Sequence, residues 1–484
     1  MERLYFVACM LTLLGVLNAD GRTPSGPDEV DEVLAAAGRT SAARVWRAGM
    51  SAGGRPIEAV ELGCDPQNAA WKVLLVGRQH GDEPAGGEAL VELIRLISEG
   101  NRTIPDDTTV WVVPMVNPDG AAAGNRSNGA GADLNRDHIR LDQPETRALH
   151  RLARELRPHV VVDCHEFTRD SADYLERGWG EWPLITMDVS NHPLLPRGLY
   201  ETGLRWLDRA SQRMADRGFS FRRYLVGGVP PEEELRPSTL DGDDARNGLA
   251  LDGSLGFIIE SGILRRAENP NADLDRRVAA YLELLDLLVS DATLRAGTRA
   301  AVQAARRAPV PEFVPCNVFW ANATGAISAI KVVDLATGRT RAVETPNLMR
   351  DRVTKRSVRA PMGYVIDRSA ADLYRGLLER HAIPFETTTQ EVVVRAEPVQ
   401  LVRVESAWDP VYARYGGRQI TQILPPAELE LPTGSIVVRL DGPHWRRAVV
   451  LLEPAQLYGL YQYSDYRDQV SVQGVTPVAR LINP

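Results

Sequence analysis

Metal-binding residue types follow an apolar run early in the chain. Residues 73–76 are all valine or leucine, and His80 and Glu83 come soon after them. Ligands of open α/β sheets collect at the carboxyl ends of strands, so an imidazole and a carboxylate at this point can converge on one ion. The alternative interpretation is that both side chains hydrogen-bond to the backbone of their own loop.

A second imidazole follows another apolar run. Residues 160–162 are all valine, and His165 comes shortly after them. Catalytic zinc is held by three protein ligands of the histidine, histidine and glutamate kind, and it keeps a further position open for water. The sequence therefore predicts one zinc ion bound by His80, Glu83 and His165.

Acidic residues near these predicted strand ends indicate supporting roles. Asp163 and Glu166 lie beside His165 and are candidates to orient a ligand histidine. Glu260 ends a third apolar run, residues 257–259, where burial of an unpaired carboxylate is costly and therefore indicates a function. Such a residue can act as the general base that takes a proton from a metal-activated water. A surface-facing glutamate at a strand end is the alternative.

The segment between the predicted ligands is rich in glycine, alanine and asparagine, and it contains Arg126 and Arg136. Loops of this composition usually only reverse the chain direction. An arginine beside a metal can polarise a carbonyl oxygen, or it can clamp a carboxylate through two hydrogen bonds. We expect Arg126 and Arg136 to divide these two tasks.

The elements that position these residues alternate between strands and helices from residue 20 to residue 307. This alternation predicts an α/β fold with a mixed, mostly parallel sheet flanked by helices. The expected strands are residues 59–62, 72–77, 109–115, 160–164 and 257–260, and the expected helices are residues 88–97, 144–155, 199–215 and 274–289. The runs 73–76 and 160–162 are apolar on both faces, which is typical of interior strands.

Three prolines within residues 303–316 interrupt this alternation and predict a domain boundary. We expect a catalytic domain at residues 20–307 and a β-rich accessory domain of unknown role at residues 308–484. The strands expected in the second domain are residues 328–333, 391–394, 401–404 and 435–440, and one helix is expected at residues 370–381.

The first 19 residues have the pattern of a cleaved signal peptide. Arg3 precedes an apolar run at residues 4–17, and small and charged residues follow it. The run is shorter than the about 20 residues that a membrane-spanning helix needs. We therefore expect a secreted or periplasmic protein with no stable membrane span after cleavage; a buried N-terminal helix is the alternative.

The amino-acid composition excludes several classes of protein. The 484 residues are 44% hydrophobic and 25% charged, values typical of a globular protein of about two domains. The net charge of −8 gives the chain no long-range attraction for nucleic acid. We expect no nucleic-acid partner.

Four blocks of the sequence resemble the zinc carboxypeptidases of the carboxypeptidase A type, in their bacterial secreted branch. They are His80-Gly-Asp-Glu83, Arg126-Ser-Asn128 to Asp133-Leu-Asn135-Arg136, Asp163-Cys-His165 and Ile259-Glu260, in the family's order. The resemblance implies zinc ligands at His80, Glu83 and His165, a water-activating base at Glu260, and an oxyanion-stabilising Arg126. It also implies that Asn135 and Arg136 hold the terminal carboxylate of a peptide substrate.

The sequence departs from the family pattern at two places. Asp82 stands where many members have an arginine, so the outer substrate contacts are expected to differ. No tyrosine occurs in residues 225–259, where pancreatic-type members have one that closes over the substrate, and Tyr224 is the nearest candidate.

Three functions are consistent with these residues. The first is an exported zinc carboxypeptidase that hydrolyses the C-terminal peptide bond of peptides. The second is a zinc-dependent deacylase of N-acyl amino acids, similar to the desuccinylases and aspartoacylases, which share a like arrangement of ligands. The third is a catalytically inactive binding protein, which the presence of all ligands and of the base disfavours.

Overall fold

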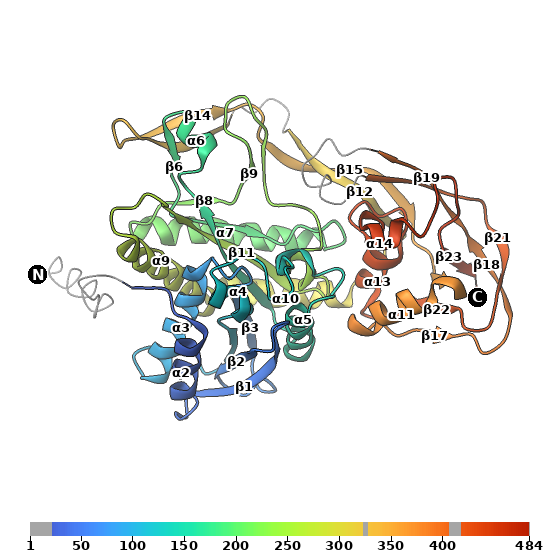
Figure 1. Ribbon diagram of the computed structural model, residues 1–484, viewed down its shortest axis with the longest axis horizontal. Coiled ribbons are helices and arrows are strands. Elements are labelled where there is room, and N and C mark those ends of the chain that lie inside the picture. The colour runs from blue at the N-terminus through green and yellow to red at the C-terminus, as the bar shows by residue number, and fades with distance from the viewer. Residues whose placement is uncertain (1–21, 323–327, 406–417, 484) are drawn as a thin grey trace, which may run out of the picture.

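An eight-stranded mixed sheet occupies the first 260 residues or so, in the order β1-β2-β4-β3-β5-β11-β7-β8 (Figure 1). The computed structural model describes residues 22–322, 328–405 and 418–483. The strands are β1 (Ala43–Met50), β2 (Pro56–Gly63), β3 (Trp71–Gly77), β4 (Thr108–Val113), β5 (Val160–Thr168), β7 (Ile185–Val189), β8 (Phe221–Arg223) and β11 (Leu255–Ile263). The pairs β3–β4, β3–β5, β5–β11 and β7–β8 are parallel, and the remaining pairs are antiparallel.

Helices cover both faces of this sheet. The helices of this part of the chain are α2 (Pro27–Ala37), α3 (Pro84–Ser98), α4 (Pro118–Ala123), α5 (Pro144–Leu156), α6 (Ala172–Glu176), α7 (Arg197–Asp216), α8 (Ala245–Gly248), α9 (Pro270–Ser290) and α10 (Ala292–Arg307). Of these, α6 packs in a separate small core with β13 (Ser328–Asp334) and β14 (Thr340–Thr345). Alternate residues of β3 point to opposite faces, so Val73 and Leu75 pack in one core with α3, α7 and α9. Leu74 packs in a second core with α5. The α/β fold with a mixed, mostly parallel sheet is therefore confirmed.

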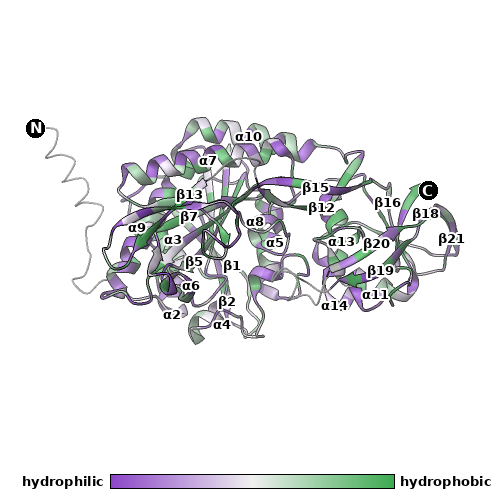
Figure 2. Ribbon diagram, turned by 90° about the horizontal axis from the view of Figure 1, so that it is seen from above, coloured by the Kyte–Doolittle hydropathy of each residue, from purple (hydrophilic) through white to green (hydrophobic). Residues whose placement is uncertain are grey.

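The elements expected from the sequence are present in this part of the chain. Each expected strand and helix lies within, or overlaps, an observed one, and Figure 2 colours several of the buried strands as largely hydrophobic. The edge strands β1 and β8 and the antiparallel β7 were not predicted. Apolar and polar residues alternate less clearly in these three strands. Contacts with neighbouring strands and helices decide how such strands pair, so their own sequence pattern is a weak signal.

The region after residue 307 is rich in strands, as expected. A long ribbon pairs β12 (Phe313–Asn322) with β15 (Met349–Arg359), and a hairpin pairs β13 (Ser328–Asp334) with β14 (Thr340–Thr345). A six-stranded antiparallel sheet and one further pair follow; their strands are β16 (Gly363–Ile366), β17 (Glu386–Thr387), β18 (Val392–Glu397), β19 (Val399–Glu405), β20 (Arg418–Ile423), β21 (Ala427–Leu431), β22 (Ile436–Arg439) and β23 (Val478–Asn483).

Helices pack against this second sheet. The helix expected at residues 370–381 is α11 (Ala371–Arg380). Two further helices, α13 (Trp445–Leu452) and α14 (Ser464–Arg467), were not predicted. All eight residues of α13 are buried. A helix is recognised in a sequence by one apolar and one exposed polar face, and α13 has no exposed face.

The two regions share one sheet. Strand β6 (Trp179–Glu181), which comes before residue 307, pairs with β13, which comes after it. The hairpin β13–β14 of the C-terminal region thus forms a separate three-stranded sheet with β6 (Figure 1). No helix in the described part of the chain has the length and apolar character needed to cross a membrane. The expected signal peptide, residues 1–19, lies outside the described residues.

Candidate active site

The carboxyl ends of β3, β5 and β11 bring the predicted chemical groups together. After β3 the chain turns at Arg78, which has a left-handed backbone (φ 57°) and donates a hydrogen bond from Nε to the Gly81 carbonyl at 3.1 Å. A Cβ atom at Gly81 would lie 2.0 Å from the carbonyl carbon of Gly120, so only glycine fits this tight loop. The loop carries His80 and ends at Glu83, directly before α3.

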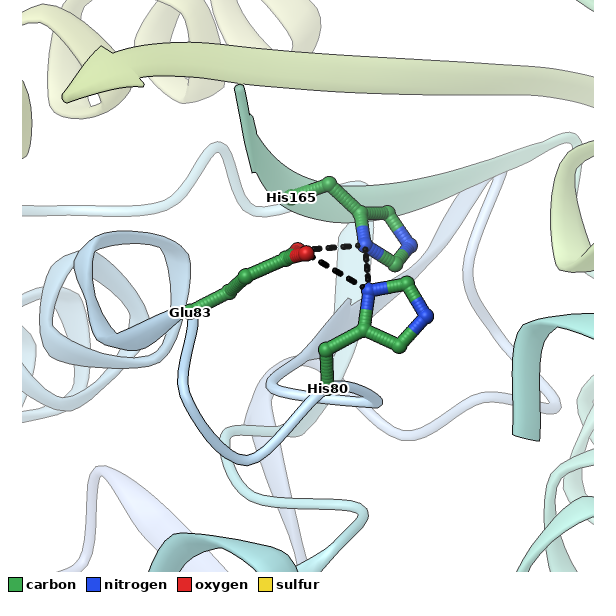
Figure 3. A group of neighbouring side chains, drawn as sticks. All are labelled: His80, Glu83 and His165. Carbon is green, nitrogen blue, oxygen red and sulfur yellow. Dashed lines mark hydrogen bonds and ion pairs between the residues drawn. The ribbon is translucent and has the colours of Figure 1, made fainter. Parts of the chain in front are cut away.

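Two imidazoles and one carboxylate face one another at this edge of the sheet (Figure 3). Nδ1 of His80 lies 2.8 Å from one oxygen of Glu83, and Nδ1 of His165 lies 2.8 Å from the other. The two Nδ1 atoms are 3.1 Å apart. The three residues form the group that fits a metal ion among the described residues, with ligand atoms all within 4.8 Å of one another.

The chemistry of these donors fits zinc. Neutral imidazole nitrogen and carboxylate oxygen are both common zinc donors, and three of them leave a position open. Burial raises the pKa of Glu83, but the adjacent His80 and His165 outweigh it and hold that pKa well below its ordinary value. The carboxyl group therefore stays ionised, as a metal ligand must be.

Aspartates hold the far side of each imidazole. Nε2 of His165 lies 2.8 Å from Asp163, and Nε2 of His80 lies 3.1 Å from Asp133. A carboxylate only accepts hydrogen bonds, so each pair favours a proton on Nε2 and a free electron pair on the Nδ1 that faces the centre. Asp163 thus occupies the orienting position that its sequence neighbourhood predicted.

Glu166 does not share that position. Its carboxylate accepts a hydrogen bond from the backbone N–H of Ala85 and pairs with Arg277 at 2.6 Å. It therefore joins the start of α3 to α9 and contacts neither imidazole through these bonds. The expectation that Glu166 orients a ligand histidine has no support in these contacts.

Glu260 lies on the strand next to His165. The parallel register of β11 and β5 sets Glu260 directly opposite His165. Burial raises the pKa of Glu260 to about 8, and the negative charges of Glu83 and Asp163 add to it. The positive charge of His165 and a hydrogen bond from Tyr224 act in the opposite direction. The result is a buried carboxyl group whose pKa is close to neutral pH.

Arg126 reaches the cluster from the glycine-rich loop. Its Nη1 lies 3.1 Å from Glu83 and 3.1 Å from Nδ1 of His80, and its Nη2 pairs with Asp133 at 3.0 Å. The side chain is 44% exposed. Its guanidinium therefore presents donors both to the metal-binding group and to solvent in the pocket.

Arg136 and Asn135 differ in how accessible they are. Arg136 lines the pocket, and its Nη1 donates a hydrogen bond to the backbone carbonyl of Asn135. The side chain of Asn135 is buried, with Oδ1 accepting from the Ala245 backbone N–H at 2.8 Å and Nδ2 lying 3.0 Å from Nε2 of His165. The structure thus brings both residues to the site, and their role in binding a substrate stays a prediction.

All the predicted site residues border one pocket of about 150 Å³. Its wall opposite the metal-binding group comes from the segment between β8 and β11. The lining residues are His80, Glu83, Arg126, Asn135, Arg136, His165, Glu166, Tyr224, Val226, Ser238, Thr239, Asp244, Ile258 and Glu260. The pocket therefore combines two imidazoles, several carboxylates and two guanidinium groups within one small volume.

A family model described as zinc carboxypeptidase matches residues 33–153 of the chain. The chain carries a zinc carboxypeptidase domain. This match supports the interpretation of the protein as a metallocarboxypeptidase, a hydrolase of peptide bonds. The matched residues include His80, Glu83 and both pocket arginines, whereas His165 and Glu260 follow the match and complete the cluster in three dimensions.

Several known carboxypeptidases are similar to this protein. Carboxypeptidase 2 of Trichophyton tonsurans is 24% identical over 440 residues, which cover 86% of this chain and 76% of that protein. Carboxypeptidase SOL1 of Arabidopsis thaliana is 30% identical over 142 residues, which cover 25% of this chain and 28% of that protein. A crystal structure of a metallo-carboxypeptidase from Burkholderia cenocepacia has a TM-score of 0.43 and 18% identity, and covers 58% of this chain and 70% of that one.

Sequence reasoning missed a buried polar chain behind this carboxypeptidase site. Gln79 donates to Asp163 at 2.8 Å, Nε2 of His138 lies 2.9 Å from Oε1 of Gln79, and Nδ1 of His138 lies 3.0 Å from Nε2 of His150. Burial lowers the pKa of His138 to about 4, so its imidazole is neutral near neutral pH. No fixed spacing along the chain links Gln79, His138 and His150. The only signal in the sequence was that polar residues stand next to the ligand blocks.

Proposed function

We propose that this protein is an exported metallocarboxypeptidase that binds one zinc ion and removes the C-terminal residue of peptides. The observation that carries the proposal is the convergence of His80, His165 and Glu83 beside the buried Glu260. In this proposal residues 20–307 form the catalytic domain, residues 308–484 form an accessory domain, and residues 1–19 are removed during export.

His80, Glu83 and His165 are the proposed zinc ligands, and the aspartates behind the two histidines support this assignment. Zinc held in this way lowers the pKa of a bound water and polarises a carbonyl oxygen. The chain itself contributes the fixed tautomers of both histidines and the ionised state of Glu83.

Glu260 is the proposed general base. A base of this kind must accept a proton from water and then give it to the leaving amine, which is easiest when its pKa lies near the working pH. The pKa of Glu260, raised to about 8 mainly by burial, supports a carboxyl group that can exchange a proton in this range. The hydrogen bond from Tyr224 lowers this pKa and so favours the ionised carboxylate that accepts the proton.

The two pocket arginines are proposed to bind different oxygens of the substrate. Arg126 lies beside the metal-binding group and would stabilise the oxyanion that forms at the attacked carbonyl. Arg136, with Asn135, would hold the C-terminal carboxylate of the peptide. Fixing that carboxylate sets the last peptide bond at the reacting centre, and this is what makes the enzyme an exopeptidase.

A panel of substrates tests the proposal. The purified protein is freed of metal with a chelator, reconstituted with zinc, and assayed with a blocked dipeptide, an N-acyl amino acid and a murein stem peptide. We expect zinc to restore release of the C-terminal residue from the dipeptide. Cleavage of only the N-acyl amino acid would instead establish the deacylase, and zinc binding without any hydrolysis would establish a binding protein. The N-terminal sequence of protein recovered outside the cytoplasm tests the export proposal.

A further inference from the structure

The pocket wall opposite the metal-binding group has little regular structure of its own. Residues 224–244 connect β8 to α8 and contain only the short strands β9 (Val226–Gly227) and β10 (Leu235–Arg236). Five residues of this wall segment line the pocket, namely Tyr224, Val226, Ser238, Thr239 and Asp244. Since neither a helix nor a long strand fixes its path, its conformation depends on what packs against it.

One contact comes from the turn between β14 and β15. Nδ2 of Asn347 donates a hydrogen bond to the carbonyl of Glu232 at 3.0 Å. In return the backbone N–H of Leu235 donates to the carbonyl of Asn347 at 3.2 Å. Leu235 also forms a parallel bridge with Leu348. The middle of the wall segment is thus bonded to the C-terminal region just before β10 and within it.

A second contact lies directly behind a pocket residue. The indole Nε1 of Trp320, on β12, donates a hydrogen bond to the carbonyl of Ser238 at 3.1 Å. The Trp320 side chain is buried, and the Ser238 side chain and backbone N–H donate to Asp188 beneath the pocket. Ser238 is therefore held between the central sheet and the C-terminal ribbon.

A third contact comes from the segment between α13 and α14. Nε2 of Gln462 donates a hydrogen bond to the carboxylate of Asp241 at 3.3 Å, and both side chains are buried. Apolar packing joins the same regions, because Val229 and Leu235 share a small core with Ile330, Val332 and Leu348. Figure 1 shows the segment that carries β9 on the side of the sheet where β14 lies.

We propose that the region after residue 308 shapes the substrate pocket, because Trp320, Asn347 and Gln462 hold the wall segment 224–244 in its substrate-binding conformation. These are positioning residues, since they contact the segment and not the reacting groups. The zinc-binding group belongs to other loops, so loosening the wall should weaken substrate binding and leave the metal in place. The kinetic part of this inference rests on the proposed peptidase function.

Two tryptophans provide a matched test. Trp445 also donates a hydrogen bond from Nε1 to a backbone carbonyl, that of Ala308 at 3.2 Å, but it does not belong to the pocket wall contacts. Trp320→Phe and Trp445→Phe therefore each remove one indole N–H from the same region. Each variant is compared with the unaltered protein in zinc content, in kcat and KM for a blocked dipeptide, and in amide hydrogen exchange followed by mass spectrometry.

For Trp320→Phe we expect faster exchange confined to residues 224–244 and about a fivefold higher KM, the factor that corresponds to one lost hydrogen bond. Its kcat should change less, and its zinc content should be unchanged. Trp445→Phe should alter neither the exchange of the wall segment nor KM. Equal effects of the two variants, or unchanged exchange in Trp320→Phe, would overturn the proposal.

Asn347→Asp gives a second route in case Trp320→Phe folds poorly. Asn347 is only half-buried, and the aspartate keeps its shape while losing the donor to Glu232. We expect the same local rise in exchange, at residues 231–236. The exchange measurement needs no substrate, so it decides the positioning role even if the unaltered protein cleaves no peptide. In that case only the proposed function would fail.

Discussion

Gln79 donates a hydrogen bond of 2.8 Å to Asp163, whose other oxygen lies 2.8 Å from Nε2 of the proposed zinc ligand His165. Because the amide N–H₂ of Gln79 faces a carboxylate, its carbonyl oxygen must be the acceptor on the other side, toward His138. His138 then carries its proton on Nε2 and accepts from His150 on Nδ1. One carboxylate therefore fixes the orientation of an amide and the tautomers of three buried histidines, His165, His138 and His150.

Gln79→Glu should weaken zinc binding. The new carboxyl group would face Asp163, and two carboxylates at that distance compete for one proton, so Asp163 would become a poorer acceptor for His165. Changes to groups that orient a ligand typically cost 10- to 100-fold in metal affinity. We expect a rise of about that size in the zinc dissociation constant, measured by competition with a coloured chelator.

Gln212→Glu is the matched control for this substitution. Gln212 lies on the exposed surface of α7, where its Nε2 also donates to an aspartate, Asp216, at 2.8 Å. The same change of charge is thus made beside a carboxylate far from the proposed ligands. If the two variants bound zinc equally well, Gln79 would have no role in orienting His165.

The sequence was sufficient to predict the proposed ligands because each one follows a buried apolar run. His80, His165 and Glu260 come at or just after apolar runs, and the parallel sheet brings such ends to one edge. Gln79 and His138 were not predicted, because their roles depend on distances across the fold and not on a spacing along the chain. The wall segment 224–244 was not predicted either, since its path is set by contacts with residues more than 80 positions away.

Glu260→Gln should abolish most turnover and leave zinc bound. The amide has nearly the same shape but cannot accept a proton from water, and general-base catalysis typically contributes 10²- to 10⁴-fold. We expect kcat to fall by about that factor, with a zinc content equal to that of the unaltered protein. Near-normal turnover of a blocked dipeptide by this variant would contradict the assignment of Glu260 as the base.

Arg136→Ala should impair binding of a free C-terminal carboxylate. If the guanidinium of Arg136 holds this carboxylate, its loss should raise KM for a blocked dipeptide acid by about 10-fold or more, whereas the matching dipeptide amide should be little affected. Arg126→Ala is the comparison, because it should lower kcat for both substrates through the oxyanion. Equal loss on acid and amide in Arg136→Ala would exclude a carboxylate clamp at this position.

His381→Gln should make the protein less sensitive to acid. His381 lies at the end of α11, where it is buried and its Nε2 contacts the carbonyl of Ile139 in the first region at 2.7 Å. Burial lowers the pKa of His381 to about 3, from an ordinary value of 6.5. The unfolded chain therefore takes up a proton as the pH falls below about 6.5, whereas the folded chain does so only near pH 3.

Because of this difference, the free energy of unfolding keeps its full value above pH 6.5 and falls progressively as the pH drops from 6.5 to about 3. One such histidine contributes up to about 1.4 kcal/mol per pH unit to the slope of the free energy of unfolding. Glutamine keeps an N–H donor for the Ile139 carbonyl but does not titrate, so the variant should show a slope shallower by up to that amount. Urea unfolding at pH 7, 6, 5 and 4 measures both slopes. Parallel slopes would mean that His381 takes up its proton in the folded protein as readily as in the unfolded chain.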